Sequence, residues 1–463
     1  MNAVRISMFV ILDGLLCIVS GRRYRPTWES LDTRPAPNWF DRAKIGIFLH
    51  WGVFAVPSFN GEWFWYYWKS GDKASMKFMQ DNYPPGFKYA DFATYFTAEF
   101  YNASQWAELF KNAGAKYVVL TSKHHEGYTM WPSSVSFNWN VKDVGPNKDL
   151  LGELADATKS AGLHFGVYHS LYEWFNPIYE SDKRSGFRRQ DFVRNKCLPE
   201  LYELVNNYEP DVIWSDGDWE APAEYWNTTN FLAWLYNDSP VRDSVLVNDR
   251  WGIGIPCKHG DFYNCKDRYN PGVFLPHKWE NAMTLDRKSW GYRRVMNISD
   301  VLSIDELVAT LVQTVSCNGN LLVNVGPRKD GIIDPIFQER LLQMGDWLRI
   351  NGEAIYESKT WQRQNDTINK NVWYTSKGDV VYAIILKPDS GGQVRLGSFN
   401  SANIGSATEM TVLGFDGKLT FAIDSAGISI MIPVLRSQAN QVAISIRITG
   451  LKKCNQWDLD ENL

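Results

Sequence analysis

The sequence predicts an α/β fold, an eight-stranded β/α (TIM-like) barrel followed by a C-terminal antiparallel β-sandwich. Between residues 44 and 326, short apolar runs alternate with amphipathic segments, which is typical of strands alternating with helices in a parallel sheet. The number of these units favours a closed barrel over an open sheet. From Val372 onward, short alternating runs are separated by Gly, Asp, Asn and Ser, which is typical of antiparallel strands and turns.

The N-terminus has the composition of a secretory signal peptide. Arg5 precedes an apolar stretch that ends in small residues, although Asp13 interrupts this stretch. We therefore expect residues 1–20 to be a signal peptide, residues 21–358 to form the barrel and residues 359–463 to form the sandwich.

The barrel strands are predicted from short apolar runs, each followed by polar and aromatic residues. Amphipathic periodicity predicts the helices between them, and Gly114 and Gly162 stand where glycine commonly ends a helix. No glycine-rich phosphate-binding loop follows a strand, which argues against a nucleotide-binding protein. The predicted strands are residues 45–49, 117–120, 165–168, 212–214, 245–247 and 321–325, and the predicted helices are residues 104–113, 150–161, 191–207 and 304–315.

Charge and composition exclude several classes of protein. The 48 Lys and Arg against 52 Asp and Glu give a net charge of −4, which argues against nucleic acid or an anionic membrane as partner. The hydrophobic fraction of 44% excludes a disordered chain. The 21 Trp, 22 Tyr and 24 Phe often stand beside polar residues, as in carbohydrate sites, where flat aromatic faces pack on sugar C–H groups. A core rich in tryptophan is the alternative interpretation.

The residues that follow the predicted strands form the candidate site, because the active site of a β/α barrel lies at the carboxyl ends of its strands. Asp216 follows a buried-looking run and is the candidate nucleophile, with a helix cap or a loop aspartate as the alternative. Neutral imidazoles both donate and accept hydrogen bonds, so the histidines suit sugar hydroxyls. The spacings typical of zinc sites are absent, so we predict neither a metal nor another cofactor. The other strand-end residues are His50, His124, His125, Tyr168, His169, Trp214 and Arg250.

Cysteines and sequons carry two further predictions. Cys257 and Cys265 lie close together in a loop rich in Gly and aromatic residues, and we expect them to form a disulfide. The pairing of Cys197, Cys317 and Cys454 is left open. The predicted glycosylation sites are Asn102, Asn227, Asn237, Asn297 and Asn365.

Several motifs resemble those of glycoside hydrolase family 29, the α-L-fucosidases, and in particular its animal branch. They are FLHWG, SKHHEGYTMW, WSDGDWEAPAEYW, VNDRWG, HKWE with SWGYRR, and INGEAIYES, in this order, and the similarity extends from Trp28 to Tyr356. The resemblance implies a retaining exo-glycosidase that releases terminal fucose from glycoproteins, glycolipids or oligosaccharides, without a metal, in the lysosome or outside the cell. A homo-oligomer is left open. Ala282 stands where the family usually has cysteine.

Carried over position by position, the resemblance makes Asp216 the nucleophile. It also implies a fucose pocket formed by His50, Glu62, Trp63, His124, His125, Tyr168, Trp214, Arg250 and Trp290.

The second carboxyl group of a retaining glycosidase must protonate the leaving oxygen. Asp267 is the preferred acid/base, because the bacterial relatives carry theirs in the corresponding loop and the expected disulfide ends two residues before it. Glu280, in the KWE motif, is the alternative, and Glu62 is expected to bind a fucose hydroxyl.

Two other classes of protein are alternatives to a retaining glycosidase. A catalytically silent fucose lectin on the same scaffold needs neither Asp216 nor a second carboxylate opposite it, whereas the sequence has both. A metal-dependent hydrolase would lose activity on dialysis against a chelator.

Overall fold

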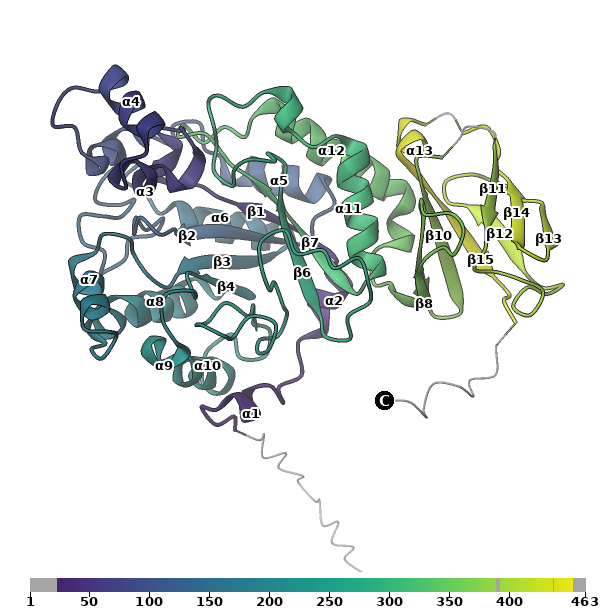
Figure 1. Cartoon of the computed structure of the whole chain (residues 1–463), viewed down its shortest axis with the longest axis horizontal. Helices are drawn as coiled ribbons and strands as arrows, with labels where there is room; N and C mark the ends of the chain where they lie inside the picture. Colours follow the sequence, from purple (N-terminus) through teal and green to yellow (C-terminus); the bar gives the residue numbers. More distant parts are fainter. Residues whose placement is uncertain (1–22, 389–391, 436, 453–463) are drawn as a thin grey trace, which may run out of the picture.

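The computed structural model describes residues 23–388, 392–435 and 437–452. The predicted signal peptide and Cys454 lie outside these residues. Figure 1 shows a large α/β unit and, next to it, a smaller unit built mainly of strands.

A curved parallel sheet forms the centre of the larger unit (Figure 1). Its strands are joined in the order β5-β4-β3-β2-β1-β7-β6. Nearly every residue in them is buried, because the strands pack against the barrel interior on one face and against helices on the other, which explains their continuous apolar runs. The strands are β1 (Ile45–Leu49), β2 (Tyr117–Lys123), β3 (His164–Ser170), β4 (Val212–Asp216), β5 (Leu246–Val247), β6 (Trp279–Thr284) and β7 (Gly319–Val325).

A short irregular segment takes the eighth position of the barrel. The N–H of Asp261 donates to the carbonyl of Val247 at the edge of β5 (3.0 Å). Tyr263 then pairs with β6, since its N–H donates to Lys278 and its carbonyl accepts from Glu280, both at 2.9 Å. The barrel prediction is therefore confirmed, with seven regular strands and one bridging segment.

Helices cover the outside of the sheet. The four predicted helices are present, and Gly114 and Gly162 follow two of them with φ of +88° and +78°, as a helix-ending glycine requires. They are α5 (Ala103–Asn112), α6 (Leu150–Ser160), α8 (Leu198–Tyr208, preceded by a π-helical turn at Val193–Cys197) and α11 (Ile304–Ser316). The others are α1 (Trp28–Leu31), α2 (Asn38–Ala43), α3 (Phe64–Lys69), α4 (Lys73–Asn82), α7 (Pro177–Arg184), α9 (Ala223–Trp226), α10 (Thr228–Asn237) and α12 (Pro335–Asn351).

Antiparallel strands form two sheets in the C-terminal part, in the orders β12-β15-β10-β9-β8 and β11-β14-β13. Apolar side chains of both sheets, including Tyr374 and Ile430, share one buried cluster, so the predicted β-sandwich is confirmed. The elements are β8 (Lys359–Asn365), β9 (Val372–Lys377), β10 (Val380–Leu386), β11 (Gln393–Leu396), β12 (Glu409–Val412), β13 (Phe421–Asp424), β14 (Gly427–Met431), α13 (Gln438–Val442) and β15 (Ala443–Thr449).

Aromatic side chains fill the barrel interior. Phe48, Tyr117, Tyr168, Trp214 and Phe262 belong to one buried cluster there, separate from the core under the helices. This packed interior gives the site above it a rigid floor. None of the described helices has the length and apolar character needed to cross a bilayer.

Candidate active site

A cavity of about 330 Å³ lies at the carboxyl ends of the barrel strands. It brings together all the residues assigned to the nucleophile, the preferred acid/base and the fucose pocket. These are His50, Glu62, Trp63, His124, His125, Tyr168, Trp214, Asp216, Arg250, Asp267 and Trp290.

Asp216 is the last residue of β4 and is held by neighbours on two sides. The Tyr168 hydroxyl donates to Oδ2 (2.8 Å), and Nη1 of Arg250 donates to Oδ1 (2.9 Å). The side chain is only 11% exposed, so these two donors replace most of the water that would solvate its charge. The arrangement fixes the carboxylate in one orientation, as a nucleophile requires.

Arg250 joins Asp216 to Asp267. Its second terminal nitrogen, Nη2, donates to Oδ1 of Asp267 at 2.7 Å, and the guanidinium lies 4.7 Å from the Trp214 ring centroid. Burial opposes the charge of Arg250, but the carboxylates of Asp216 and Asp267 raise its pKa above the ordinary value. One cation therefore connects both candidate catalytic groups. The Asp267 side chain is 49% exposed, in contrast to Asp216.

Two of the cavity histidines, His50 and His125, are neutral. Burial, reinforced by the neighbouring His124, lowers the pKa of His50 and of His125 well below the ordinary value. His50 Nδ1 lies 2.7 Å from Oδ1 of Asn324, an acceptor, so the proton resides on Nδ1 and Nε2 is free to accept. His125 Nδ1 is likewise 2.6 Å from the Ser170 hydroxyl.

Glu62 holds the loop that carries Trp290. Its Oε2 accepts from the backbone N–H groups of Trp290 (3.1 Å) and Gly291 (2.8 Å) and from the Ser289 hydroxyl (3.0 Å). No donor in the described chain reaches Oε1. Glu62 therefore positions an aromatic wall and keeps one oxygen for a ligand hydroxyl.

Glu280, the alternative acid/base, does not line the cavity. It is fully buried in the barrel interior, where it accepts from Tyr117 (2.6 Å), Trp214 (2.9 Å) and Asn264 (3.2 Å). Burial raises its pKa to about 7, against the opposing effect of these donors. Because its hydrogen bond with the Trp214 indole lies beneath the cavity, Glu280 is placed to orient the floor of the site.

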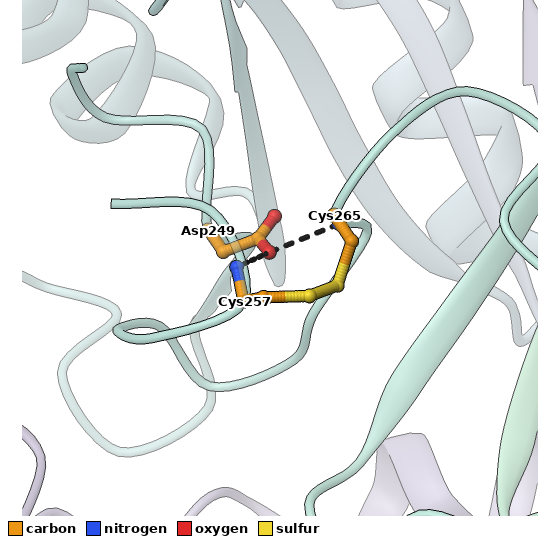
Figure 2. Close-up of side chains that lie close together, drawn as sticks. All are labelled: Asp249, Cys257 and Cys265. Atoms are coloured by element: carbon orange, nitrogen blue, oxygen red, sulfur yellow. Dashed lines mark hydrogen bonds between the residues drawn. A yellow bond between two sulfur atoms is a disulfide. The ribbon is translucent and has the colours of Figure 1, made fainter. Parts of the chain in front are cut away.

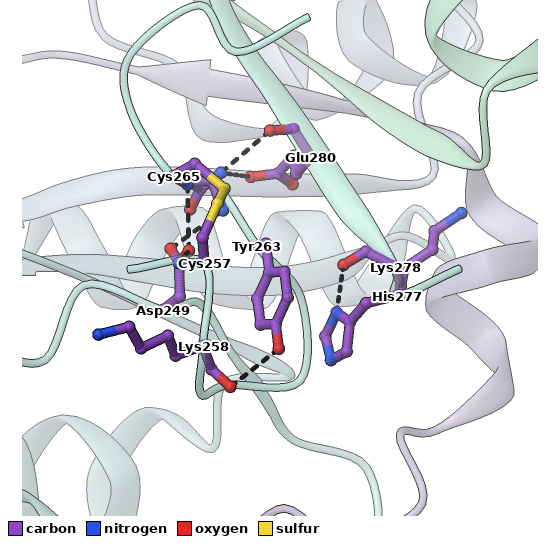
Figure 3. The surroundings of a disulfide bond; sticks show 9 residues. Asp249, Cys257, Lys258, Tyr263, Cys265, His277, Lys278 and Glu280 are labelled. Carbon is purple, nitrogen blue, oxygen red and sulfur yellow. Dashed lines mark hydrogen bonds between the residues drawn. A yellow bond between two sulfur atoms is a disulfide. The ribbon is translucent and has the colours of Figure 1, made fainter. Parts of the chain in front are cut away.

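The predicted disulfide between Cys257 and Cys265 is confirmed, with Cα atoms 4.9 Å apart. Asp249, directly before Arg250, accepts from the backbone N–H groups of both cysteines, at 2.7 and 3.0 Å (Figure 2). The loop is tied down further by the Tyr263 hydroxyl, which donates to the carbonyl of Lys258 at 2.9 Å (Figure 3). The disulfide and Asp249 therefore fix the loop two residues before Asp267.

The described residues contain one group of side chains close enough to share a metal ion. Among their His, Cys, Asp and Glu side chains, the atoms close enough to share an ion belong to Asp249, Cys257 and Cys265. Both sulfurs are used by the disulfide, so this group cannot act as a metal site. His169, which directly follows the third predicted strand, lies outside the cavity lining and contacts Glu200 at 3.0 Å.

Six further residues line the cavity, and the sequence analysis did not assign them to the site. Phe48 could have been found by strand alternation, because it lies two residues before His50 on the same face. Asp218 and Trp219 directly follow the WSDG motif, whereas the remaining three come from a loop without periodicity. These six residues are Phe48, Asp218, Trp219, Pro256, Cys265 and Lys266.

Comparisons with known proteins agree with this geometry. The α-L-fucosidase family model matches residues 17–353, and the model of the α-L-fucosidase C-terminal domain matches residues 364–449. The human plasma α-L-fucosidase is 58% identical over 421 residues, covering 90% of each chain, and the human tissue α-L-fucosidase is 55% identical over 435 residues, covering 93% of each.

A solved structure shares the architecture. The Thermotoga maritima α-fucosidase in complex with a mechanism-based inhibitor superposes with a TM-score of 0.80 at 33% identity, covering 92% of this chain and 100% of that one. Fold, site and sequence together place this chain in the α-L-fucosidase family, whose members hydrolyse terminal fucose.

Proposed function

We propose that this α-L-fucosidase acts by double displacement, with Asp216 as nucleophile and Asp267 as acid/base. The observation that carries the proposal is the bridge through Arg250, which binds one oxygen of each carboxylate at the same cavity. A retaining glycosidase needs two such groups at one anomeric centre.

The geometry suits each group to its role. Asp216, held by Tyr168 and Arg250, attacks the anomeric carbon and forms the fucosyl-enzyme, and the leaving oxygen departs with a proton from Asp267. No described residue donates to Oδ2 of Asp267, so we assign proton transfer to this oxygen. In the second step the same oxygen takes a proton from water, which attacks the fucosyl-enzyme and releases fucose.

The test of the acid/base is its dependence on the leaving group. An Asp267→Ala enzyme should keep much of its glycosylation rate on an aryl fucoside whose phenol needs no proton. On a fucosyl disaccharide it should lose about 10²- to 10⁴-fold, because the sugar alkoxide cannot depart unprotonated. Glu280→Ala is the comparison variant. If Glu280→Ala shows this split and Asp267→Ala does not, the assignment passes to Glu280.

The neutral imidazoles of His50 and His125 and the aromatic walls support a fucose pocket, with these imidazoles accepting from sugar hydroxyls and Trp290 facing an apolar part of the sugar. We propose His50, Glu62, Trp63, His124, His125, Tyr168, Trp214, Arg250 and Trp290 as its residues.

We propose a lysosomal or secreted enzyme that acts on fucosylated glycoproteins, glycolipids or oligosaccharides. The plasma and tissue relatives support this, as does the predicted signal peptide at residues 1–20. The division into residues 21–358 and 359–463 is supported by β8, which begins at Lys359.

The asparagines of the sequons differ in whether their side-chain nitrogen Nδ2 already donates hydrogen bonds. Asn237 Nδ2 donates to two carbonyls, and so does Asn365 Nδ2. Within the described chain, Nδ2 of Asn102, Asn227 and Asn297 has no such partner. We therefore propose these three as the preferred glycosylation sites. Peptide mass mapping of the expressed protein tests this order of preference.

A further inference from the structure

The cavity has a buried floor and an exposed mouth. Most lining side chains are buried, but Trp219, Lys266 and Asp267 are exposed to solvent. The proposed acid must contact the oxygen that joins fucose to the leaving group. The leaving group therefore lies on the side of Asp267, at the mouth, where residues outside the fucose pocket can contact it.

Trp219 presents an aromatic surface at this mouth. The side chain is 44% exposed. Its ring meets those of His125 and Tyr172 in T-shaped contacts, with centroids 5.5 and 5.7 Å apart and interplanar angles of 81°. These contacts hold the indole in place without covering it. A fixed, open indole suits the C–H face of a pyranose ring.

Other aromatic side chains, half-buried or exposed, continue this surface. Trp63 lies nearly parallel to Trp219, with an interplanar angle of 25° and centroids 6.4 Å apart. Trp63 also contacts Tyr66 and Tyr67 of α3, which are 39% and 40% exposed. An aromatic band thus extends outward from the cavity, as expected where a chain of sugars passes.

Asp218 adds an unused polar group beside Trp219. It lines the cavity and is only 8% exposed, and no side chain of the described residues donates to its carboxyl group. Burial, followed by the negative charge of Asp216, raises its pKa to about 7. In an acidic compartment the group is protonated, so it can both donate to and accept from a ligand hydroxyl or amide. The carboxyl group therefore has hydrogen-bonding capacity that a ligand in the cavity would use.

We propose that Trp219 and Asp218 form a binding subsite for the sugar to which fucose is attached. The Trp219 face packs on the pyranose ring, and Asp218 hydrogen-bonds a polar substituent of that sugar. The inference rests on the proposed function, because Asp267 as acid/base places the leaving group at the mouth. It makes these two residues determinants of the aglycone preferred by the enzyme.

The test compares two substrates that differ only in the leaving group. α-L-Fucosyl fluoride has no sugar in this subsite, whereas a fucosyl disaccharide fills it. Trp219→Ala should lower kcat/KM for the disaccharide about tenfold and for the fluoride less than threefold, because the stacking contact exists only with the disaccharide. Trp219→Phe should restore most of the loss. Phe137→Ala removes a 79% exposed aromatic side chain outside the cavity and serves as the control.

Asp218→Asn tests the polar half of the subsite in the same way. A loss confined to the disaccharide supports the assignment, and an equal loss on the fluoride would place Asp218 in the fucose pocket instead. For Trp219→Ala, equal losses on both substrates, or no loss on either, would overturn the proposal.

A failure of the proposed subsite can be distinguished from a failure of the acid/base assignment. Loss of the acid makes the rate depend on leaving-group acidity and alters the pH profile, whereas loss of a stacking surface does neither. The Trp219→Ala enzyme should also need about tenfold more free acceptor sugar for half-maximal fucosyl transfer from the fluoride. This transfer measurement can be interpreted whichever carboxyl group proves to be the acid. An unchanged acceptor requirement would contradict the subsite.

Discussion

Asp216 and Asp267 both bind Arg250, but different kinds of structure hold them. Asp216 ends β4, a strand whose five residues are all buried, and its position follows from the barrel itself. Asp267 lies in the irregular loop after Arg250, with a half-exposed side chain. The position of Asp267 depends on the Cys257–Cys265 disulfide and on Asp249, which binds both ends of that bridge.

This difference suits the two chemical tasks. A nucleophile must attack one carbon from a fixed direction, which a buried strand end provides. An acid/base must meet a leaving group and then water at the same place, so it needs access to the cavity mouth. Because the loop is held by a few specific bonds, we expect Asp267 to be sensitive to distant changes that leave Asp216 unaffected.

The largest effect is expected from Asp216→Gly. Activity should fall by several orders of magnitude on every substrate, because the proposed nucleophile is removed. Asp211→Gly, a change just before the other end of β4, is the matched control and should retain turnover. Steady-state rates of the two variants, with melting temperatures to show that both are folded, measure the difference. Substantial activity in Asp216→Gly would remove it as nucleophile.

A smaller but general loss is expected from Arg250→Lys. A lysine presents a single ammonium group and cannot span two carboxylates as the guanidinium does. We expect kcat/KM to fall about 10²-fold for an activated aryl fucoside, because Asp216 loses a partner, and further for a disaccharide, which also depends on Asp267. Initial rates on the two substrates measure this. An effect limited to the disaccharide would show that Arg250 serves Asp267 alone.

Removal of the disulfide should affect the loop selectively. In a Cys257→Ser, Cys265→Ser enzyme, we expect about a tenfold loss of kcat on a disaccharide, because Asp267 is less well positioned. An activated aryl fucoside, which needs little proton transfer, should change less than threefold and acts as the internal control. Equal losses on both substrates would mean that the bridge supports the whole site.

The smallest expected effect is on how the melting temperature depends on pH. Burial raises the pKa of Glu280 to about 7 from an ordinary 4.5, so the folded state keeps a proton that the unfolded chain has released. This contribution to stability is complete below pH 4.5 and is lost as the pH rises through 7. The melting temperature should therefore fall less between pH 5 and pH 7.5 in Glu280→Gln than in the wild type. An equal fall in both proteins would contradict the raised pKa.

Much of the barrel and of the fucose pocket could be predicted from the sequence, because each buried strand is a short apolar run and polar residues follow where it ends. His50, His124, Tyr168 and Asp216 illustrate this rule. It fails for β6 (Trp279–Thr284), which is not among the six predicted strands because WENAMT is not an apolar run. It also fails for the eighth position, where residues 261–264 pair through backbone hydrogen bonds without an apolar run.

The sequence could not place the loop side chains. Asp261 and Asp267 are the two carboxylates between Gly252 and His277, yet Asp261 is paired with Arg34 (3.2 Å), far less exposed and outside the cavity. Composition and spacing do not separate the two, because the loop path depends on the disulfide and on Asp249. For the same reason, the sequence does not predict that Pro256 and Lys266 line the cavity.

Added azide can act as a nucleophile in enzymes that lack a catalytic carboxylate. The anomeric configuration of the fucosyl azide that forms tests most directly whether Asp216 is the nucleophile and Asp267 the acid/base. With an activated aryl fucoside and azide, Asp216→Gly should give β-L-fucosyl azide, because azide replaces the missing nucleophile in one inversion. Asp267→Ala should give α-L-fucosyl azide, because azide then attacks the fucosyl-enzyme formed on Asp216. The anomeric configuration of each product can be read by NMR. An α product from Asp216→Gly, or a β product from Asp267→Ala, would contradict the account.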